Sequence, residues 1–204
     1  VWSWLVNNDV DTLSYGGRAE ITSSIGEFGF TYHQTPENSI QYIGQPGIPF
    51  YGSHNRIGVD FRFDGFIGLW NENVLIKSDE SKLGLITVGA DYTIPVANGF
   101  LVMTESMYIY NKDNNLNSDQ TYSVFMASLP IGMIHQIMYI SQVDWKEDKT
   151  YQYLRWSSTY DDYSLNMIIS MNPKRNQYDI PVSSLPKSLS GFGTGIQFMF
   201  VYNH

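Results

Sequence analysis

Apolar and polar residues alternate with a period of two along much of this chain. From Phe28 to Tyr32 every second residue is aromatic, and a similar alternation runs over residues 56–64 and 86–94. Successive side chains of a β-strand point to opposite faces, so the pattern predicts strands with one apolar and one polar face. No segment has the period of an amphipathic helix.

The alternation predicts about twelve strands, each close to the ~9–11 residues that cross a bilayer when a strand is tilted. The expected strands cover residues 1–6, 18–25, 27–33, 56–64, 66–77, 86–94, 100–110, 121–129, 134–145, 151–160, 163–172 and 193–203. Short connections (25–26, 64–65, 96–99, 130–132 and 161–162) alternate with longer, mostly polar ones (34–53, 78–82, 111–119, 146–150 and 173–190). Outer-membrane barrels have this asymmetry, with short periplasmic turns and longer external loops.

We therefore expect an all-β fold, an antiparallel up-and-down transmembrane β-barrel of about 12 strands, with residues 1–204 forming a single domain. Both termini then lie on the periplasmic side. The chain begins at Val1 without a methionine or signal peptide, so we expect a processed form or a piece of a longer barrel.

Composition narrows the expected partners. The chain is 43% hydrophobic and 15% aromatic, but it has no apolar run long enough for a membrane-spanning helix. Its fifteen tyrosines suit a surface that meets both lipid and water. The net charge of −8 and the lack of a basic stripe argue against a nucleic-acid partner, and the absence of cysteine excludes disulfides and thiolate chemistry. A soluble β-protein with the apolar face in its core remains the alternative.

Four segments carry a resemblance: 15–33, 56–60, 87–93 and the terminal Gly195–His204. They resemble porin-like outer-membrane β-barrel proteins of Bacteroidota, over most of the chain, through the pattern of strands and without a catalytic signature. The resemblance implies a location in the bacterial outer membrane and a precursor longer than this chain. The ending Tyr202-Asn203-His204 departs from the aromatic final residue of many such barrels.

If the apolar face contacts lipid, the charged residues of the other face line the lumen. The candidates are Arg18, Glu20, Asp60, Arg62, Glu72, Asp91, Glu105, Asp144 and Arg155. Acidic and basic members are interleaved, and two interpretations stay open. They can order permeating solutes or bind a polar ligand, or they can form a salt-bridged network that fills a narrow lumen.

The sequence predicts no catalytic residue, metal or cofactor. The four histidines lack metal-ligand spacing, and Ser53-His54-Asn55 has no convincing third partner for catalysis. We expect a porin-like channel for small polar solutes that is not an enzyme. The alternative is a structural or accessory barrel subunit of a larger outer-membrane complex.

Besides outer-membrane lipid, the expected contacts are other envelope proteins, reached through the 34–53 and 173–190 loops. The 34–53 loop is rich in proline and glycine, and it carries more apolar residues than an exposed loop needs. It is expected to fold into the barrel as a constriction, to dock on a partner, or to pack on its own rim.

Overall fold

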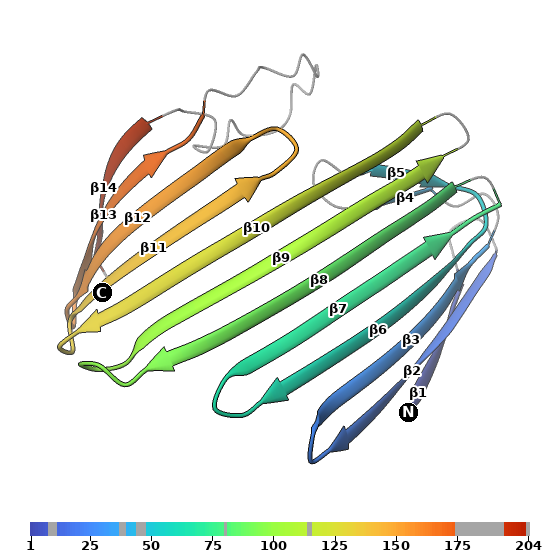
Figure 1. Cartoon of the computed structure of the whole chain (residues 1–204), viewed down its shortest axis with the longest axis horizontal. Coiled ribbons are helices and arrows are strands. Elements are labelled where there is room, and N and C mark those ends of the chain that lie inside the picture. The colour runs from blue at the N-terminus through green and yellow to red at the C-terminus, as the bar shows by residue number, and fades with distance from the viewer. Residues whose placement is uncertain are drawn as a thin grey trace. The chain divides into compact units, whose positions relative to one another are not determined.

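The computed structural model describes residues 1–7, 12–36, 40–43, 48–79, 81–113, 116–173 and 194–202, without the side chains of 40–43, 48–51, 113 and 116. Regular structure in this part of the chain consists of strands (Figure 1). They are β1 (Trp2–Asn7), β2 (Leu13–Ser23), β3 (Gly26–Thr35), β4 (Ile40–Ile43), β5 (Ile48–Tyr51), β6 (His54–Asp64), β7 (Gly68–Lys77), β8 (Ser81–Ile94), β9 (Phe100–Asp113), β10 (Leu116–Ile131), β11 (His135–Asp144), β12 (Lys149–Thr159), β13 (Tyr163–Met171) and β14 (Thr194–Tyr202).

Twelve of these strands form one antiparallel up-and-down sheet in the order β1-β2-β3-β6-β7-β8-β9-β10-β11-β12-β13-β14. Strands β4 and β5 pair only with each other in a second, two-stranded sheet. The all-β, twelve-strand, up-and-down prediction is confirmed at this level. Within the described residues, no helix is long and apolar enough to cross a membrane.

The 34–53 connection differs from its sequence-based prediction as a loop. Strand β3 runs to Thr35, β6 starts at His54, and the β4–β5 hairpin lies between them in the sequence. Strands β9 and β10 likewise extend into the predicted 111–119 connection. Ladder hydrogen bonds join backbone groups, so a ladder can continue through polar residues after the apolar alternation has ended. Most of the predicted 173–190 loop, from residue 174 on, lies outside the described residues.

The chain divides into two compact units, and each is described by itself. The first unit is Val1–Ala90 with Ser106–Thr121, and the second is Asp91–Glu105 with Tyr122–His204. The prediction of a single domain stays a prediction.

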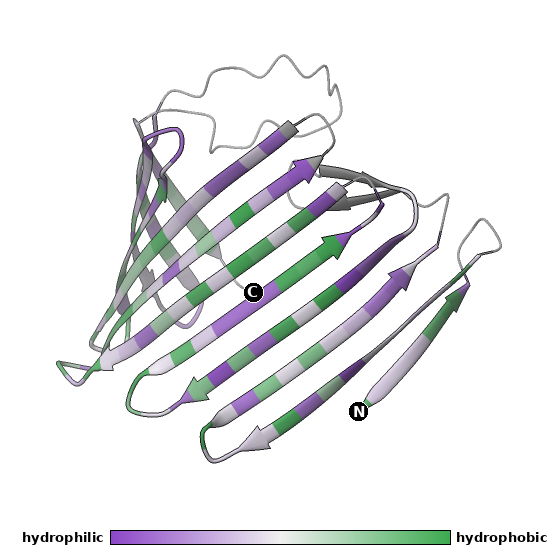
Figure 2. Ribbon diagram, turned by 45° about the vertical axis from the view of Figure 1, so that its right-hand side comes forward, coloured by the Kyte–Doolittle hydropathy of each residue, from purple (hydrophilic) through white to green (hydrophobic). Residues whose placement is uncertain are grey.

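In the first unit, register separates the two faces of the sheet. Ile21, Phe28 and Phe61 are paired across β2, β3 and β6 on what we call the apolar face. The neighbouring row, Glu20, Gly29, Asp60 and Glu72, lies on the polar face. Figure 2 shows the resulting alternation of hydrophobic and hydrophilic residues along the strands.

The second unit has the same separation. Ile196, Phe198 and Phe200 of β14 pair with Ile169, Met167 and Leu165 of β13 on its apolar face. The intervening residues of β13, such as Asn166, point to the opposite, polar face. In both units the one-residue alternation that predicted strands also assigns the faces.

Candidate functional site on the polar face

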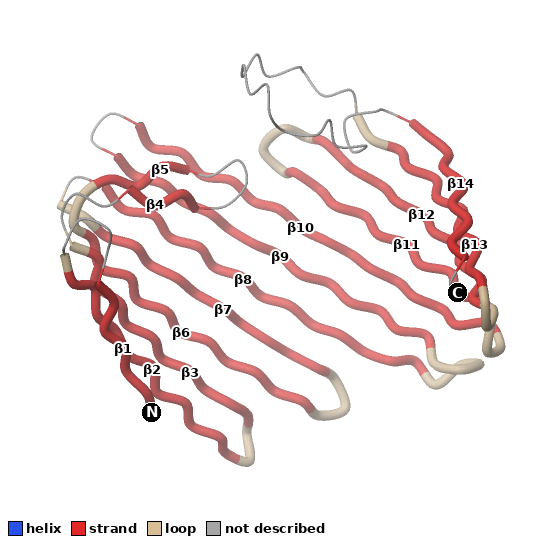
Figure 3. The backbone as a smooth tube through the Cα atoms, turned by 180° about the vertical axis from the view of Figure 1, so that it is seen from behind, coloured by secondary structure: helices blue, strands red, loops and turns tan. Residues whose placement is uncertain are grey.

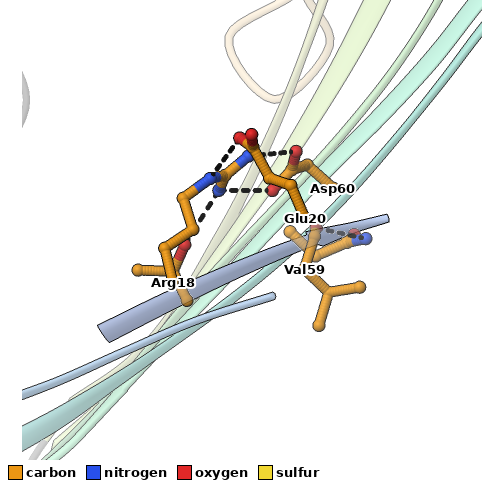
Figure 4. Close-up of polar contacts among 6 residues, drawn as sticks. Arg18, Glu20, Val59 and Asp60 are labelled. Carbon is orange, nitrogen blue, oxygen red and sulfur yellow. Dashed lines mark hydrogen bonds and ion pairs between the residues drawn. The ribbon is translucent and has the colours of Figure 1, made fainter. Parts of the chain in front are cut away.

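Arg18 is the centre of a charged cluster that joins three strands of the first unit (Figure 4). Its Nη1 and Nη2 donate to the two carboxylate oxygens of Asp60, at 2.8 and 2.7 Å. Its Nε donates to Oε1 of Glu20 at 2.7 Å, and Nη1 also donates to Oγ1 of Thr31 at 2.8 Å. The guanidinium thus contacts two carboxylates and one hydroxyl.

Register explains how residues 42 positions apart in the sequence meet. Arg18 on β2 is paired with Thr31 on β3, so its side chain must cross β3 to reach Asp60 on β6. It crosses beside Gly29, which is the register partner of Asp60. A Cβ atom on Gly29 would overlap Nη2 of Arg18 and both carboxylate oxygens of Asp60. Glycine at this position therefore provides the space for the ion pair.

The cluster is open to solvent on one side. The Arg18 side chain is 25% exposed, and those of Asp60 and Glu20 are 34% and 50% exposed. Ion pairs in contact with water contribute little to stability, about 0–1 kcal/mol. The cluster is therefore better suited to fixing the positions of charges on an accessible face than to stabilising the fold.

The other candidates of the first unit lie nearer the short connection that follows β6, or in the neighbouring strand. Arg62 donates from Nε to Oδ2 of Asp64 at 2.9 Å, and both side chains are 64% exposed. Glu72 on β7 is the register partner of Asp60 and is exposed. The first unit thus brings Arg18, Glu20 and Asp60 together, with Glu72 in the same row and Arg62 in a separate exposed pair.

In the second unit, Arg155 and Asp144 bond to neutral or backbone partners. Arg155 donates from Nε and Nη2 to Oδ1 of Asn166, at 3.0 and 2.6 Å. Asp144 is 8% exposed, and its Oδ1 accepts hydrogen bonds from the backbone amides of Lys146 and Glu147 at 3.1 Å each. Asp144 therefore stabilises the turn after β11. Asp91 lies in β8 and Glu105 in β9.

The sequence-based candidate set omits several residues of the polar face. Thr31 and Gly29 take their roles from register, which the sequence does not reveal. Arg56 and His33, which are register partners, could have been found because they continue the same alternation. His33 accepts a hydrogen bond at Nδ1 from Nε1 of Trp4, at 3.0 Å.

The side chains of Ser53, His54 and Asn55 each bond to a different partner. Ser53 Oγ donates to the Thr35 carbonyl at 3.3 Å, and His54 Nδ1 lies 2.8 Å from the Gly52 carbonyl oxygen. Asn55 Oδ1 accepts from the Tyr32 hydroxyl at 2.8 Å. The His54 contact is local in the sequence, whereas those of Ser53 and Asn55 reach β3, the strand paired with β6. Among the described residues, no group of three or more histidine, aspartate or glutamate side chains is placed to hold a metal ion.

Comparison with protein-family models, with curated proteins and with solved structures finds no match to this chain. The resemblance to porin-like proteins of Bacteroidota stays a prediction.

Proposed function

We propose that this chain forms a β-barrel in a bacterial outer membrane, with the apolar face on lipid and the polar face lining a channel for small polar solutes. The observation that carries the proposal is the distribution of apolar side chains. Only two hydrophobic residues of the described chain, Ile76 and Leu83, are buried. On the apolar face, by contrast, Ile21 is 66% exposed, Phe30 50% and Phe198 76%.

Soluble monomers rarely leave a contiguous apolar surface of more than a few hundred Å² in water. Here cross-strand pairing makes the exposed residues contiguous, because Phe28 and Phe30 lie opposite Phe61 and Val59. The rings of Phe28 and Phe61 are 4.8 Å apart. A hydrocarbon environment would cover such a surface without a second protein layer, which is the arrangement of a membrane barrel.

Two asparagines lie on the apolar face of β7, and their side-chain amides have hydrogen-bond partners within the protein, as polar groups facing lipid require. Asn71 Nδ2 donates to the Thr87 carbonyl at 2.8 Å, and Asn73 Nδ2 donates to the Val59 carbonyl at 3.5 Å. Asn73 also donates to Asn71. In a bilayer an unsatisfied polar group costs several kcal/mol, so these side chains need such internal partners.

Barrel formation makes a specific demand on the two edge strands. Strands β1 and β14 stand at the ends of the strand order. Closure requires that they pair with each other, or with strands of a longer chain. In an even-stranded up-and-down barrel the first and last strands run antiparallel, so direct pairing is compatible with the observed order.

Disulfide cross-linking tests closure. The chain has no cysteine of its own, so a disulfide can form only between the introduced residues. Leu5→Cys on β1 would be combined in turn with Ile196→Cys, Phe198→Cys and Phe200→Cys on β14. One of these pairs should cross-link within a monomer folded in detergent micelles, and Leu5→Cys with Tyr139→Cys on β11 serves as the control. If none of the β14 pairs cross-links while the chain stays soluble in plain buffer, the membrane proposal is wrong.

Conductance across a planar bilayer then tests the channel itself. A closed barrel that conducts small ions supports the proposed function. A closed barrel that never conducts would instead favour the alternative, an accessory subunit whose contacts lie in a larger complex.

A further inference from the structure

The polar face of the first unit carries a second group of polar side chains, separate from the Arg18 cluster. His33 and Thr35 lie two residues apart on β3, and their register partners on β6 are Arg56 and His54. Figure 3 shows β3 and β6 side by side, followed by β2 and β1 toward the edge of the sheet. Residues directly opposite each other in an antiparallel pair have Cβ atoms about 4.5–5.5 Å apart. The four side chains therefore form a compact block at the ends of β3 and β6.

Trp4 on β1 determines which nitrogen of His33 carries the proton. Nε1 of Trp4 donates to Nδ1 of His33 at 3.0 Å, and the two rings stack with their centroids 6.0 Å apart. An indole N–H can only donate, so Nδ1 must be the acceptor and the neutral imidazole carries its proton on Nε2. Trp4 reaches His33 across Gly16, where a Cβ atom would overlap the indole. His33 is thus held in place with its Nε2–H available to a ligand.

The hydroxyl group of Thr35 is a second donor in the same block. Thr35 is 2% exposed, and its Oγ1 has no hydrogen-bond partner among the described residues. Native proteins pair the large majority of their buried side-chain polar atoms, and an exception indicates a functional role or a bound water or ion. A ligand that accepts a hydrogen bond beside Thr35 would supply the partner.

Arg56 adds a positive charge to these two neutral donors. Its side chain is half-buried, and a guanidinium has five N–H donors, so it can serve several partners at once, as that of Arg18 does. The register row through Arg56 from β1 to β7 consists of Trp4, Gly16, His33, Arg56 and Ile76, without a carboxylate. In a chain with a net charge of −8, this part of the face therefore favours an anion.

We propose that Arg56, His33 and Thr35 form an oxyanion site, which binds the phosphate or carboxylate group of a small solute. The inference rests on the proposed function, since it names a class of solute for the same channel. All three groups donate, and the planar guanidinium matches two oxygens of a phosphate or carboxylate. His33 and Thr35 are about 6.5 Å apart along β3, a gap that one group with two accepting oxygens can bridge.

Isothermal titration calorimetry tests the oxyanion site in the full chain, folded in detergent micelles and checked for a heat-dependent gel shift. Inorganic phosphate and acetate are the two probes. Arg56→Gln should weaken binding about ten-fold or more, because a charge-assisted hydrogen bond to the anion is lost. Arg62→Gln is the matched control, since Arg62 lies on the same face of β6 but pairs with Asp64, and it should change the affinity less than about two-fold.

A second variant tests the buried hydroxyl and keeps the positive charge. Thr35→Val preserves the shape of the side chain and removes only its donor, so the gel shift should be unchanged and binding should weaken about three-fold or more. Unchanged affinity would exclude Thr35 from the site. Tighter binding of phosphate than of acetate would identify a phosphate-bearing solute, and the reverse order would identify a carboxylate; either result supports the oxyanion site.

The remaining outcomes separate the site from the function on which it rests. If the folded chain binds neither probe, or if Arg56→Gln and Arg62→Gln weaken binding equally, the oxyanion site is overturned. Planar-bilayer recordings in potassium chloride then test the channel, and added phosphate should reduce the conductance of the original chain more than that of Arg56→Gln. A chain that conducts without binding either probe keeps the channel and loses the site. A chain that binds phosphate through Arg56 and never conducts keeps the site and loses the channel.

Discussion

Gly29 provides the sharpest test of the charged cluster. A Cβ atom there would overlap the Arg18 guanidinium and the Asp60 carboxylate, so Gly29→Ala forces the pair apart. Gly58→Ala is the matched control on the same face, because its Cβ would meet the Thr31 Cβ at 3.5 Å, an ordinary contact. Neither glycine has a positive φ, so alanine fits the backbone at both positions.

The magnitudes follow from three effects. Alanine in place of glycine at a compatible position stabilises by about 0.4–1 kcal/mol through the unfolded chain. This gain applies to both variants. Gly29→Ala alone loses an exposed ion pair of about 0.2–1 kcal/mol. It also suffers a local steric conflict of about 1–3 kcal/mol, reduced because the Arg18 side chain can swing away. We expect Gly29→Ala to be less stable than Gly58→Ala by about 1–2 kcal/mol.

Urea unfolding in micelles, followed by tryptophan fluorescence, measures the difference. The same pair of substitutions in an Arg18→Met, Asp60→Ala background isolates the cause, because both groups that the new Cβ would overlap are then absent and the penalty at Gly29 should shrink to the control value. If Gly29→Ala and Gly58→Ala unfold at the same urea concentration, or if the penalty persists in that background, Gly29 does not provide the space for the ion pair.

Two further predictions concern other parts of the sheet. Val59→Arg on the apolar face should impair folding into bilayers by about 2–4 kcal/mol, whereas Glu72→Arg on the polar face should not, as measured by the yield of heat-shifted protein in lipid vesicles. Arg155→Met and Asn166→Leu should be strongly non-additive in urea midpoints, since the two side chains share two hydrogen bonds; additive effects would show that the contact is absent.

Period-two alternation predicted the strands of the main sheet because it reflects a physical difference between two faces. It failed where that difference is absent. Strands β9 and β10 continue through the polar segments Asn111–Asp113 and 116–120, where backbone pairing needs no apolar face. The β4–β5 hairpin was missed because each of its strands has only four residues, too few to display a period, and because proline and glycine signal a loop.

The candidate site was predictable by face but not by contact. Alternation placed Arg18, Glu20 and Asp60 on one side, and the structure joins them there. It could not show that Arg62 would pair with Asp64 two residues away, or that Asp144 would stabilise a turn. Such partners depend on strand register and on rotamers, and both are properties of the assembled sheet.

The Arg18 cluster also explains how the register of three strands is held together. A slip of one residue between β3 and β6 would place Asp60 on the apolar face and bring Val59 or Phe61 into the position opposite Gly29. A slip between β2 and β3 would turn Arg18 toward the apolar side, away from Thr31. In the proposed barrel, where the apolar face meets lipid, either error leaves a charge without its partner on that face, which costs several kcal/mol. In that setting, a solvent-exposed ion pair that adds little to stability in the correct register discriminates strongly against the incorrect ones.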